Sequence, residues 1–479
     1  MHTLPVAIIG AGPVGLAAAA HLARYQQPFI IFEAGSEAGA AIRDWQHVRT
    51  FSPWRYMVDS ASRALLEATG WRSPDAERLP TGGDLIEHYL SPLSRHAALA
   101  PHIRFDARVN AVGRKDFDKV RTKGRDAQPF AIRLTSGEII DARAVIDASG
   151  TWAQPNPAGS GGFAAGGERE FRDRIAYGIP DVLRRERSRY ARRTVLVVGS
   201  GHSAFNVVLD LLQLADEEPG TRILWAMRRE NVSGGASDQL EARGALGQRA
   251  RQAVESGRIR VIAPFRIRDF ECLGDSLNVH GVMHEQPMDV AADQVIVNTG
   301  FRPQLEMLSE IRLGLDPWLE CPTELGPLID PNEHSCGTVR PHGARQLSHP
   351  ERDFYIAGMK SYGRAPTFLL ATGYEQVRSI AAMLAGDIAA AERVELVLPE
   401  TGVCSTDAIT GAAGGACCGS APAPSASLVA GAASSCCGGP APAGIDACCT
   451  DDATAKVQGK SGCGCNGEPV TLLQVSRTR

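Results

Sequence analysis

No cysteine precedes Cys272 in this chain of 479 residues, and nine of the 12 cysteines lie between Cys404 and Cys465. A secreted protein held by disulfides distributes its bridges through small domains. Here a large body with few cysteines carries a cysteine-dense tail, which argues against such a scaffold. The distribution predicts a reducing, cytoplasmic location.

The chain also lacks an excess of charge of one sign. It has 50 Lys and Arg against 54 Asp and Glu, a net charge of -4. This balance provides no basic field for a nucleic acid backbone. No stretch reaches the about 18 apolar residues that a membrane-spanning helix requires. The apolar N-terminal run Met1–Leu22 has no basic n-region and is interrupted by glycines, so we interpret it as strand, turn and helix rather than a signal peptide. We therefore expect a soluble protein with neither nucleic acid nor membrane as a partner.

Two segments of the chain repeat the order strand, glycine turn, helix, strand, which is the βαβ unit of nucleotide-binding folds. The length favours two or three domains. We expect an α/β protein with two Rossmann-like dinucleotide-binding domains. The first segment has strand, helix and strand at 6–9, 14–24 and 29–33, and the second has strands at 194–198 and 222–227 with a helix through about 212 between them.

The segments outside these two βαβ units predict further strands and a tail. Apolar strands at 103–105, 131–134 and 144–147 indicate an additional sheet. The runs Gln294–Val297 and Phe354–Ala357, with helical periodicity at 368–384, indicate that the first domain resumes. After about Pro399 the composition changes to Ala, Gly, Ser, Pro and Cys, which cannot bury enough surface to offset its ordering entropy. A disordered tail is expected. The predicted divisions are 1–155 (first domain, first part), 156–290 (inserted second domain), 291–399 (first domain, second part) and 400–479 (tail).

The first glycine turn contains Gly10, Gly12 and Gly15. In such a turn the first glycine permits the tight bend, the second lets the backbone approach a pyrophosphate, and the third allows close packing of helix on strand. The helix that follows offers free amides and a partial positive charge to the phosphates. Glu33 ends the next strand and can accept hydrogen bonds from ribose hydroxyls. A nucleotide site is expected; a purely structural turn is the alternative.

The second turn has Gly199 and Gly201, and we take Ser203 as the replacement of the third glycine. The strand after this turn ends in Arg228 and Arg229 instead of an acid. Guanidinium groups pair with a 2′-phosphate that a carboxylate would repel, so NADP is favoured over NAD. Two solvated loop arginines are the alternative.

With these turns, the chain resembles the flavoproteins with two dinucleotide-binding domains, and most of all the flavin-containing monooxygenases. The likeness covers about residues 4–390. Residues 147–152 and 298–303 resemble the crossovers that close the two domains, and residues 80–90 resemble the helix before the middle sheet. The resemblance implies FAD in the first domain and NADPH in the second. It implies cofactor contacts at Gly150, Gly300 and Gly358.

The chain departs from relatives in three respects. It has no CxxxxC after the first helix and no CxxC in the second domain, so the dithiol of disulfide reductases is absent. Residues 149–163 do not reproduce the family's second fingerprint. No acid follows Gly358, so we expect backbone amides there and a helix starting near Thr367 to hold the ribityl chain. Relatives bring a loop toward the flavin, and the residues of this loop are candidate cofactor or substrate contacts, although loop aromatics are more often packing residues. They are Arg43, Trp45, Trp54 and Tyr56. His202 is a lesser candidate for contact with nicotinamide.

The tail contains three pairs of adjacent cysteines and one CGC sequence. Adjacent Cα atoms are about 3.8 Å apart, shorter than a disulfide prefers, so neighbouring thiolates are better suited to one soft ion. Zinc sites space their ligands more widely, which leaves Cu(I) or arsenic(III). The pairs resemble the thiol-rich ends of arsenic-handling proteins, and a low-complexity extension is the alternative. The candidate ligands are Cys417, Cys418, Cys436, Cys437, Cys448, Cys449, Cys463 and Cys465.

Three functions remain open at this point. The first is an NADPH-dependent FAD enzyme that oxygenates a soft nucleophile, with a role in metalloid detoxification. The second is a reductase that passes flavin electrons to tail thiols or to a metal that they bind. The third is a non-enzymatic, thiol-rich metal-binding protein. The protein's contribution to hydride transfer is positioning and electrostatics, so no catalytic side chain is assigned.

Overall fold

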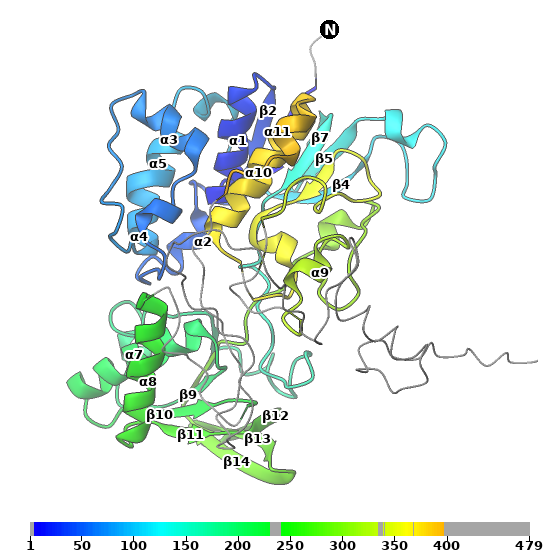
Figure 1. Ribbon diagram of the computed structural model, residues 1–479. Coiled ribbons are helices and arrows are strands. Elements are labelled where there is room, and N and C mark those ends of the chain that lie inside the picture. Colours follow the sequence, from blue (N-terminus) through cyan, green and yellow to red (C-terminus); the bar gives the residue numbers. More distant parts are fainter. Residues whose placement is uncertain (1–3, 230–240, 334–338, 340, 367, 397–479) are drawn as a thin grey trace, which may run out of the picture. The chain divides into compact units, whose positions relative to one another are not determined.

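The computed structural model describes residues 4–229, 241–333, 339, 341–366 and 368–396 (Figure 1). The chain divides into two compact units, Met1–Ala408 and Ile409–Arg479, and the first contains every residue described here. Its α-helices are α1 (Pro13–Arg24), α2 (Ala40–Arg43), α3 (Ser60–Glu67), α4 (Gly82–Leu85), α5 (Ser91–Ser94), α6 (Arg187–Tyr190), α7 (His202–Glu217), α8 (Glu241–Glu255), α9 (Gly326–Ile329), α10 (Leu370–Ala385) and α11 (Ile388–Glu392). Shorter 3-10 or π turns are η1 (Trp54–Tyr56), η2 (Ile86–Leu90), η3 (Ala100–His102), η4 (Arg125–Ala127), η5 (Glu306–Leu308) and η6 (Gly358–Tyr362).

The first sheet is parallel, with the strand order β16-β7-β1-β2-β3. Its central strand β1 is entirely apolar and buried, as expected of a parallel strand that is covered on both faces. Its strands are β1 (Val6–Ile9), β2 (Phe29–Phe32), β3 (Ile103–Arg104), β7 (Ala144–Asp147) and β16 (Phe354–Ile356). The expectation that 103–105 and 144–147 form an additional sheet was therefore wrong. β7 is buried along its whole length and β3 has only two residues, so neither carries a pattern that indicates which sheet it joins.

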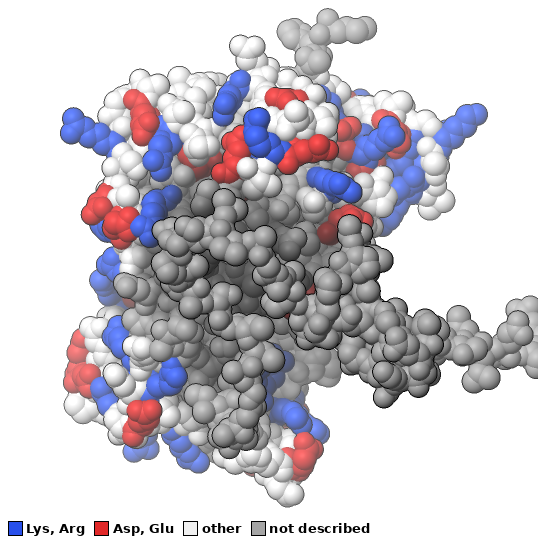
Figure 2. All heavy atoms as spheres, viewed as in Figure 1, with Lys and Arg blue, Asp and Glu red and all other residues white. Residues whose placement is uncertain are grey.

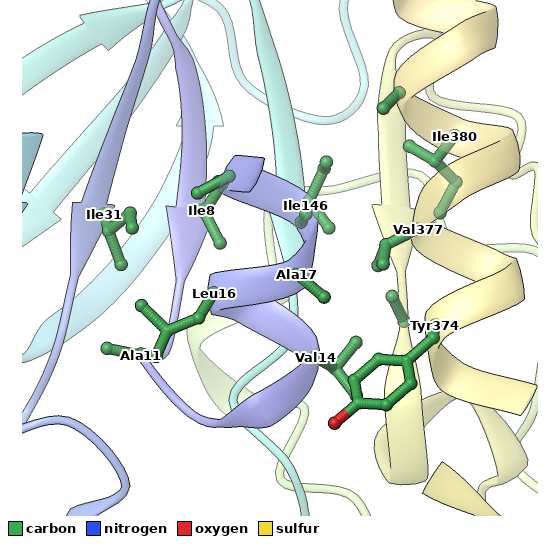
Figure 3. Packing of buried hydrophobic residues seen from close by; sticks show 14 of the residues in the cluster. Ile8, Ala11, Val14, Leu16, Ala17, Ile31, Ile146, Tyr374, Val377 and Ile380 are labelled. Carbon is green, nitrogen blue, oxygen red and sulfur yellow. The ribbon is translucent and has the colours of Figure 1, made fainter. Parts of the chain in front are cut away.

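Helix α1 lies between this sheet and α10. Figure 3 shows Val14 and Ala17 of α1 facing Tyr374 and Val377 of α10, with Ile8 of β1 on the other side. Alanines fill much of α1, which lets it approach both neighbours closely. This packing fixes the N-terminus of α1 at the carboxyl edge of the sheet.

The second sheet is also parallel, with the order β11-β10-β9-β15-β8. Its strands are β8 (Ile175–Tyr177), β9 (Thr194–Val198), β10 (Arg222–Ala226), β11 (Arg260–Ile262) and β15 (Gln294–Val297). β15 pairs with β9 and β8, so the interpretation of this segment as the first domain resuming was wrong. An apolar run of four residues fits the interior of either parallel sheet. The other divisions of the chain stay predictions.

Two antiparallel three-stranded meanders complete the described unit. One contains β4 (Val109–Arg114), β5 (Phe130–Leu134) and β6 (Ile139–Ala142); the other contains β12 (Phe265–Leu273), β13 (Ser276–Met283) and β14 (Gln286–Ala292). Of the strands expected in an additional sheet, the one at 131–134 does lie in such a meander, as part of β5.

On the described surface drawn in Figure 2, Lys and Arg side chains are interspersed with Asp and Glu side chains. The nearly equal totals of 50 and 54 residues imply this mixture. Within the described ranges, none of the helices has both the length and the apolar character that crossing a bilayer requires.

Candidate cofactor-binding site

The three glycines of the first turn have different surroundings. Gly10 has a φ of +100°, and a Cβ there would lie 2.8 Å from the Ala148 carbonyl oxygen. A Cβ at Gly15 would lie 1.9 Å from the oxygen of Gly10, so the fold itself requires both glycines. Gly12 has an ordinary φ of -76°, and apart from the adjoining backbone none of the described residues comes within 4 Å of the position its Cβ would take. The turn therefore keeps open space beside Gly12, where a diphosphate could approach the backbone.

The N-terminus of α1 faces this space. Gly12 is its N-cap and provides no side-chain hydrogen bond, and the first turn contains no acidic residue. The amides that begin a helix have no partner within it, and the helix dipole makes this end partly positive. Together they form a site suited to an anion.

Glu33 lies beside the same turn and is held by two backbone hydrogen bonds. Its Oε2 accepts from the Ala11 amide at 2.7 Å and its Oε1 from the Gly35 amide at 2.9 Å. Each carboxylate oxygen has a second lone pair, so both remain able to accept from a ribose hydroxyl. The predicted role of Glu33 is compatible with this geometry.

The second turn repeats the arrangement. Gly199 has a φ of +131°, and a Cβ there would lie 2.4 Å from the Asn298 carbonyl oxygen. Gly201 caps α7, and in the described part of the chain only the adjoining backbone lies within 4 Å of its Cβ position. Counted with the spacing of the first turn, the third position is Ala204, which is fully buried, so assigning it to Ser203 was wrong. The pattern accepts alanine in place of glycine at this position.

Arg228 and Arg229 follow β10 and Met227, and both are exposed. The Nη1 atom of Arg228 lies 3.5 Å from the Ser160 carbonyl oxygen, which is a weak contact. Both guanidinium groups belong to exposed residues at the end of the strand where a ribose would be recognised. Their role in choosing NADPH stays a prediction.

Replacing Arg228 and Arg229 together by alanine tests this role. Each charged hydrogen bond contributes about 1.5–3 kcal/mol, so the preference for NADPH over NADH should fall at least about tenfold. Steady-state or stopped-flow flavin reduction with both nucleotides measures it. The reaction with NADH should be unaffected, and an unchanged preference would remove both residues from the site.

The segments that join the two nucleotide-binding units run antiparallel to each other. Residues Pro155 and Phe301 form a β-bridge, and the Asn156 amide donates to the Gly300 carbonyl at 2.9 Å. The Asn156 side chain donates to the Thr299 carbonyl at 3.2 Å, and the Thr299 hydroxyl donates to the Asn156 carbonyl at 2.8 Å. Sequence reasoning singled out the second segment but missed Asn156. An Asn-Pro pair ahead of a Gly-rich stretch was the available signal.

The predicted contacts at Gly150, Gly300 and Gly358 all have left-handed backbone conformations, with φ of +71°, +89° and +71°. The amide of Gly358, however, donates to Oε1 of the buried Gln376 at 2.7 Å. The Gly358 amide itself is therefore already engaged inside the protein, and the role of the amides around it in holding the ribityl chain stays a prediction. α10 begins at Leu370, and Thr367 lies outside the described residues.

The loop aromatics mostly pack. Trp54 is 1% exposed within the core of the first unit, and the ring of Trp45 lies against Gly82. Arg43 pairs with Glu37 at 2.7 Å, and Arg55 lies over the ring of Tyr56. These contacts favour packing over cofactor contact. His202 begins α7, and its ring centroid lies 5.6 Å from that of Phe51.

Comparison with known proteins identifies the family. The pattern of the pyridine nucleotide-disulphide oxidoreductases matches residues 7–323. The chain belongs to this family. It is 25% identical over 235 residues to flavin-containing monooxygenase FMO GS-OX-like 3 of Arabidopsis thaliana, which covers 44% of this chain and 49% of that protein. The chain thus spans about half the length of the curated relatives it matches.

Solved structures of other flavoenzymes and disulfide reductases share the fold. A bacillithiol disulfide reductase from Bacillus cereus is 18% identical with a TM-score of 0.59, covering 80% of this chain and 99% of that one. The ornithine N-hydroxylase of Kutzneria, solved with reduced FAD, NADP+ and L-ornithine, is 16% identical with a TM-score of 0.54, covering 80% and 99%. The predicted α/β fold and the likeness to flavin-containing monooxygenases are confirmed. The family is named for a pyridine nucleotide and the curated relatives are flavin-containing, which supports FAD and NADPH as the cofactors of this oxidoreductase, and the glycines of both turns fit them.

The eight tail cysteines predicted to bind an ion lie outside the described residues. Among the residues that the structure does describe, no group of three or more His, Cys, Asp or Glu could hold a metal ion. Cys272 is exposed and Cys321 is buried, and neither forms a disulfide. Burial raises the pKa of the Cys321 thiol to about 12, so it stays protonated and unreactive.

Proposed function

We propose that this oxidoreductase reduces FAD with NADPH and uses the reduced flavin and oxygen to oxygenate a soft nucleophile. One observation carries the proposal: Gly12 and Gly201 each leave the backbone uncovered at the start of a long helix. The chain thus offers two sites for a dinucleotide diphosphate. When both cofactors are bound, NADPH supplies a hydride and FAD passes the electron pair to an acceptor.

The chain's own residues bind and orient in this scheme. The N-termini of α1 and α7 hold the two diphosphates through their free amides. Glu33 accepts from the ribose of FAD, and Arg228 with Arg229 pair with the 2′-phosphate of NADPH. The paired segments around Asn156 connect the two nucleotide-binding parts of the chain.

The choice of acceptor is supported by sequence and by relatives. The sequence has no CxxxxC after α1 and no CxxC in the predicted second dinucleotide-binding domain, so the internal dithiol of disulfide reductases has no counterpart. The curated relatives are flavin-containing monooxygenases. Both points favour oxygen over a protein dithiol. Soft nucleophiles of this kind include sulfur, nitrogen and trivalent metalloids.

The cysteine tail supports a more specific proposal within this class. Three adjacent pairs, among them Cys417–Cys418 and Cys436–Cys437, are suited to a thiophilic ion such as arsenic(III). We propose that the tail delivers a trivalent metalloid to the flavin for oxygenation. The second candidate, a reductase that passes electrons to these thiols, is favoured by the same nine cysteines.

Rapid mixing under anaerobic conditions tests the proposal. The flavin should bleach at least about tenfold faster with NADPH than with NADH, as one charged hydrogen bond to the 2′-phosphate implies. Air labelled with ¹⁸O₂ is then admitted with thiols, amines or arsenite, and product is analysed by mass spectrometry. The expected product carries one labelled oxygen atom.

Other outcomes separate the alternatives. Unlabelled product, or flavin reoxidised by the tail without oxygen, supports the reductase. Flavin that NADPH does not bleach would contradict both the monooxygenase and the reductase. Replacing the adjacent tail cysteines by serine is the control: it should abolish a preference for arsenite but leave bleaching by NADPH unchanged.

A further inference from the structure

A buried ion pair lies at the carboxyl edge of the first sheet, and the proposed function gives it no role. The ammonium of Lys360 lies 2.7 Å from Oδ2 of Asp147, and both side chains are 0% exposed. Lys360 also donates to the hydroxyl of Ser149 at 3.2 Å, and this hydroxyl donates to Oδ1 of Asp147 at 2.6 Å. The three groups form a closed cluster that reaches the surface only through the exposed Ser149.

The cluster is connected to the first glycine turn by the backbone. Asp147 ends β7, and the next amide, that of Ala148, donates to the Ile9 carbonyl of β1 at 2.9 Å. The carbonyl oxygen of Ala148 lies only 2.8 Å from the position that a Cβ of Gly10 would take. Lys360 comes from η6, which directly follows β16. Three strands thus bring their ends together around this cluster.

Stability alone does not explain the pair. Removing two charges from water is costly, and a well-packed apolar pair is often at least as stable as a buried ion pair. In open α/β sheets, ligands bind outside the carboxyl ends of the strands, which is where the cluster lies. A cation buried in a medium of low dielectric also acts on nearby charge more strongly than one in water.

We propose that Lys360, through Asp147 and Ser149, is a positioning residue for FAD. It fixes the segment after β7 against the Gly10 bend, so that the bend and the start of α1 keep the conformation that accepts the diphosphate. This inference rests on the proposed FAD site at Gly12. It adds a determinant of cofactor affinity that lies 213 residues beyond Asp147 in the sequence, and farther still from the turn.

The test separates affinity from stability with a double replacement. Apoprotein is titrated with FAD while flavin fluorescence is followed, and its thermal midpoint is measured without FAD. Lys360→Met leaves Asp147 buried without a cation, so both midpoint and affinity should fall. Lys360→Met with Asp147→Asn removes both charges and should restore the midpoint. FAD affinity should nevertheless stay about tenfold or more below that of the wild type.

FAD affinity equal to the wild type in the double variant would overturn the inference. If the double variant does not fold, Ser149→Ala decides: it removes only the hydroxyl, should keep the midpoint, and should weaken FAD about threefold, the size of a modest neutral hydrogen bond. Unchanged affinity in that variant would overturn the inference too. Wild-type apoprotein that fails to bind FAD would instead remove the proposed site. Glu351→Gln, which breaks a buried ion pair remote from the turn, should lower the midpoint without changing FAD affinity.

Discussion

Replacing Gly12 by valine is expected to yield a folded protein without flavin. The backbone at Gly12, with φ of -76° and ψ of -177°, suits any residue, and beyond the adjoining backbone no described residue reaches within 4 Å of the Cβ position. The valine side chain would therefore cost the apoprotein little, but it would occupy the space in which the diphosphate approaches the amides. FAD affinity should fall by at least about 100-fold, equivalent to about 2.7 kcal/mol. Flavin absorbance of the purified protein and FAD titration of the apoprotein measure the effect.

Gly15→Ala is the matched control within the same turn. Its Cβ would lie 1.9 Å from the Gly10 carbonyl oxygen, so the helix must move away from the strand. Overpacking of this kind costs about 1–3 kcal/mol or more and acts with or without cofactor. Apoprotein stability should thus fall in Gly15→Ala and stay unchanged in Gly12→Val. A Gly12→Val protein that binds FAD with wild-type affinity would place the diphosphate elsewhere.

The same replacement in the second turn should act on the other cofactor. Gly201 also has open space at its Cβ position and an ordinary φ of -86°. The Gly201→Val protein should still bind FAD, but NADPH should no longer reduce it. Each turn is thus tested by a different measurement, FAD binding for Gly12 and flavin reduction for Gly201. If both variants lost the same cofactor, the assignment of one dinucleotide to each turn would be wrong.

The sequence identified the two nucleotide-binding units because their signals are local. Strand β9 was predicted at its observed bounds, and α1 within one residue, since an apolar run, a glycine turn and an alanine-rich helix are neighbours along the chain. The placement of strands 144–147 and 294–297 failed for the opposite reason. Both are short, apolar and buried, and their sheet is decided by partners that lie far away in the sequence.

The site shows the same division. The turns and the arginines after β10 were recognised by spacing, whereas the partners of Lys360 and Gln376 were not. Lys360 meets Asp147 across 213 residues, and no periodicity or spacing links them. Gln376 lies on an apolar helix and takes the Gly358 amide that was expected to serve the cofactor. Contacts of this kind follow from packing, which a single sequence does not reveal.

Glu351→Gln should cause the largest loss of stability among changes outside the glycine turns. Glu351 is buried between two arginines: Oε1 accepts from Nε of Arg114 and Oε2 from Nη2 of Arg125, both at 2.8 Å. The Arg125 side chain is 0% exposed and also donates to the carbonyls of Asp118 and Glu310. Neutralising the carboxylate leaves two buried cations without an anion, a loss of about 3–5 kcal/mol.

The pH dependence of stability gives this prediction a second readout. Burial alone would raise the pKa of Glu351, but hydrogen bonds from Arg125 and Arg114 and from the Arg312 amide lower it overall. A carboxyl whose pKa is lower in the folded than in the unfolded state contributes stability above its unfolded pKa of about 4.3 and loses it as pH falls through the folded value. The urea midpoint of the wild type should therefore fall in acid. The difference between the midpoints of the wild type and Glu351→Gln should shrink there.

The control is Glu37→Gln, which breaks the exposed pair with Arg43, whose side chains are 44% and 42% exposed. An exposed pair contributes about 0–1 kcal/mol, so this variant should unfold near the wild-type urea midpoint at neutral pH. The two variants remove the same charge and differ in the burial of the partner arginines. Equal midpoints would mean that the Arg114–Glu351–Arg125 network does not hold the β4–β6 meander to the segment before β16. A loss confined to Glu351→Gln locates the stabilisation in the burial of that carboxylate between its two guanidinium groups.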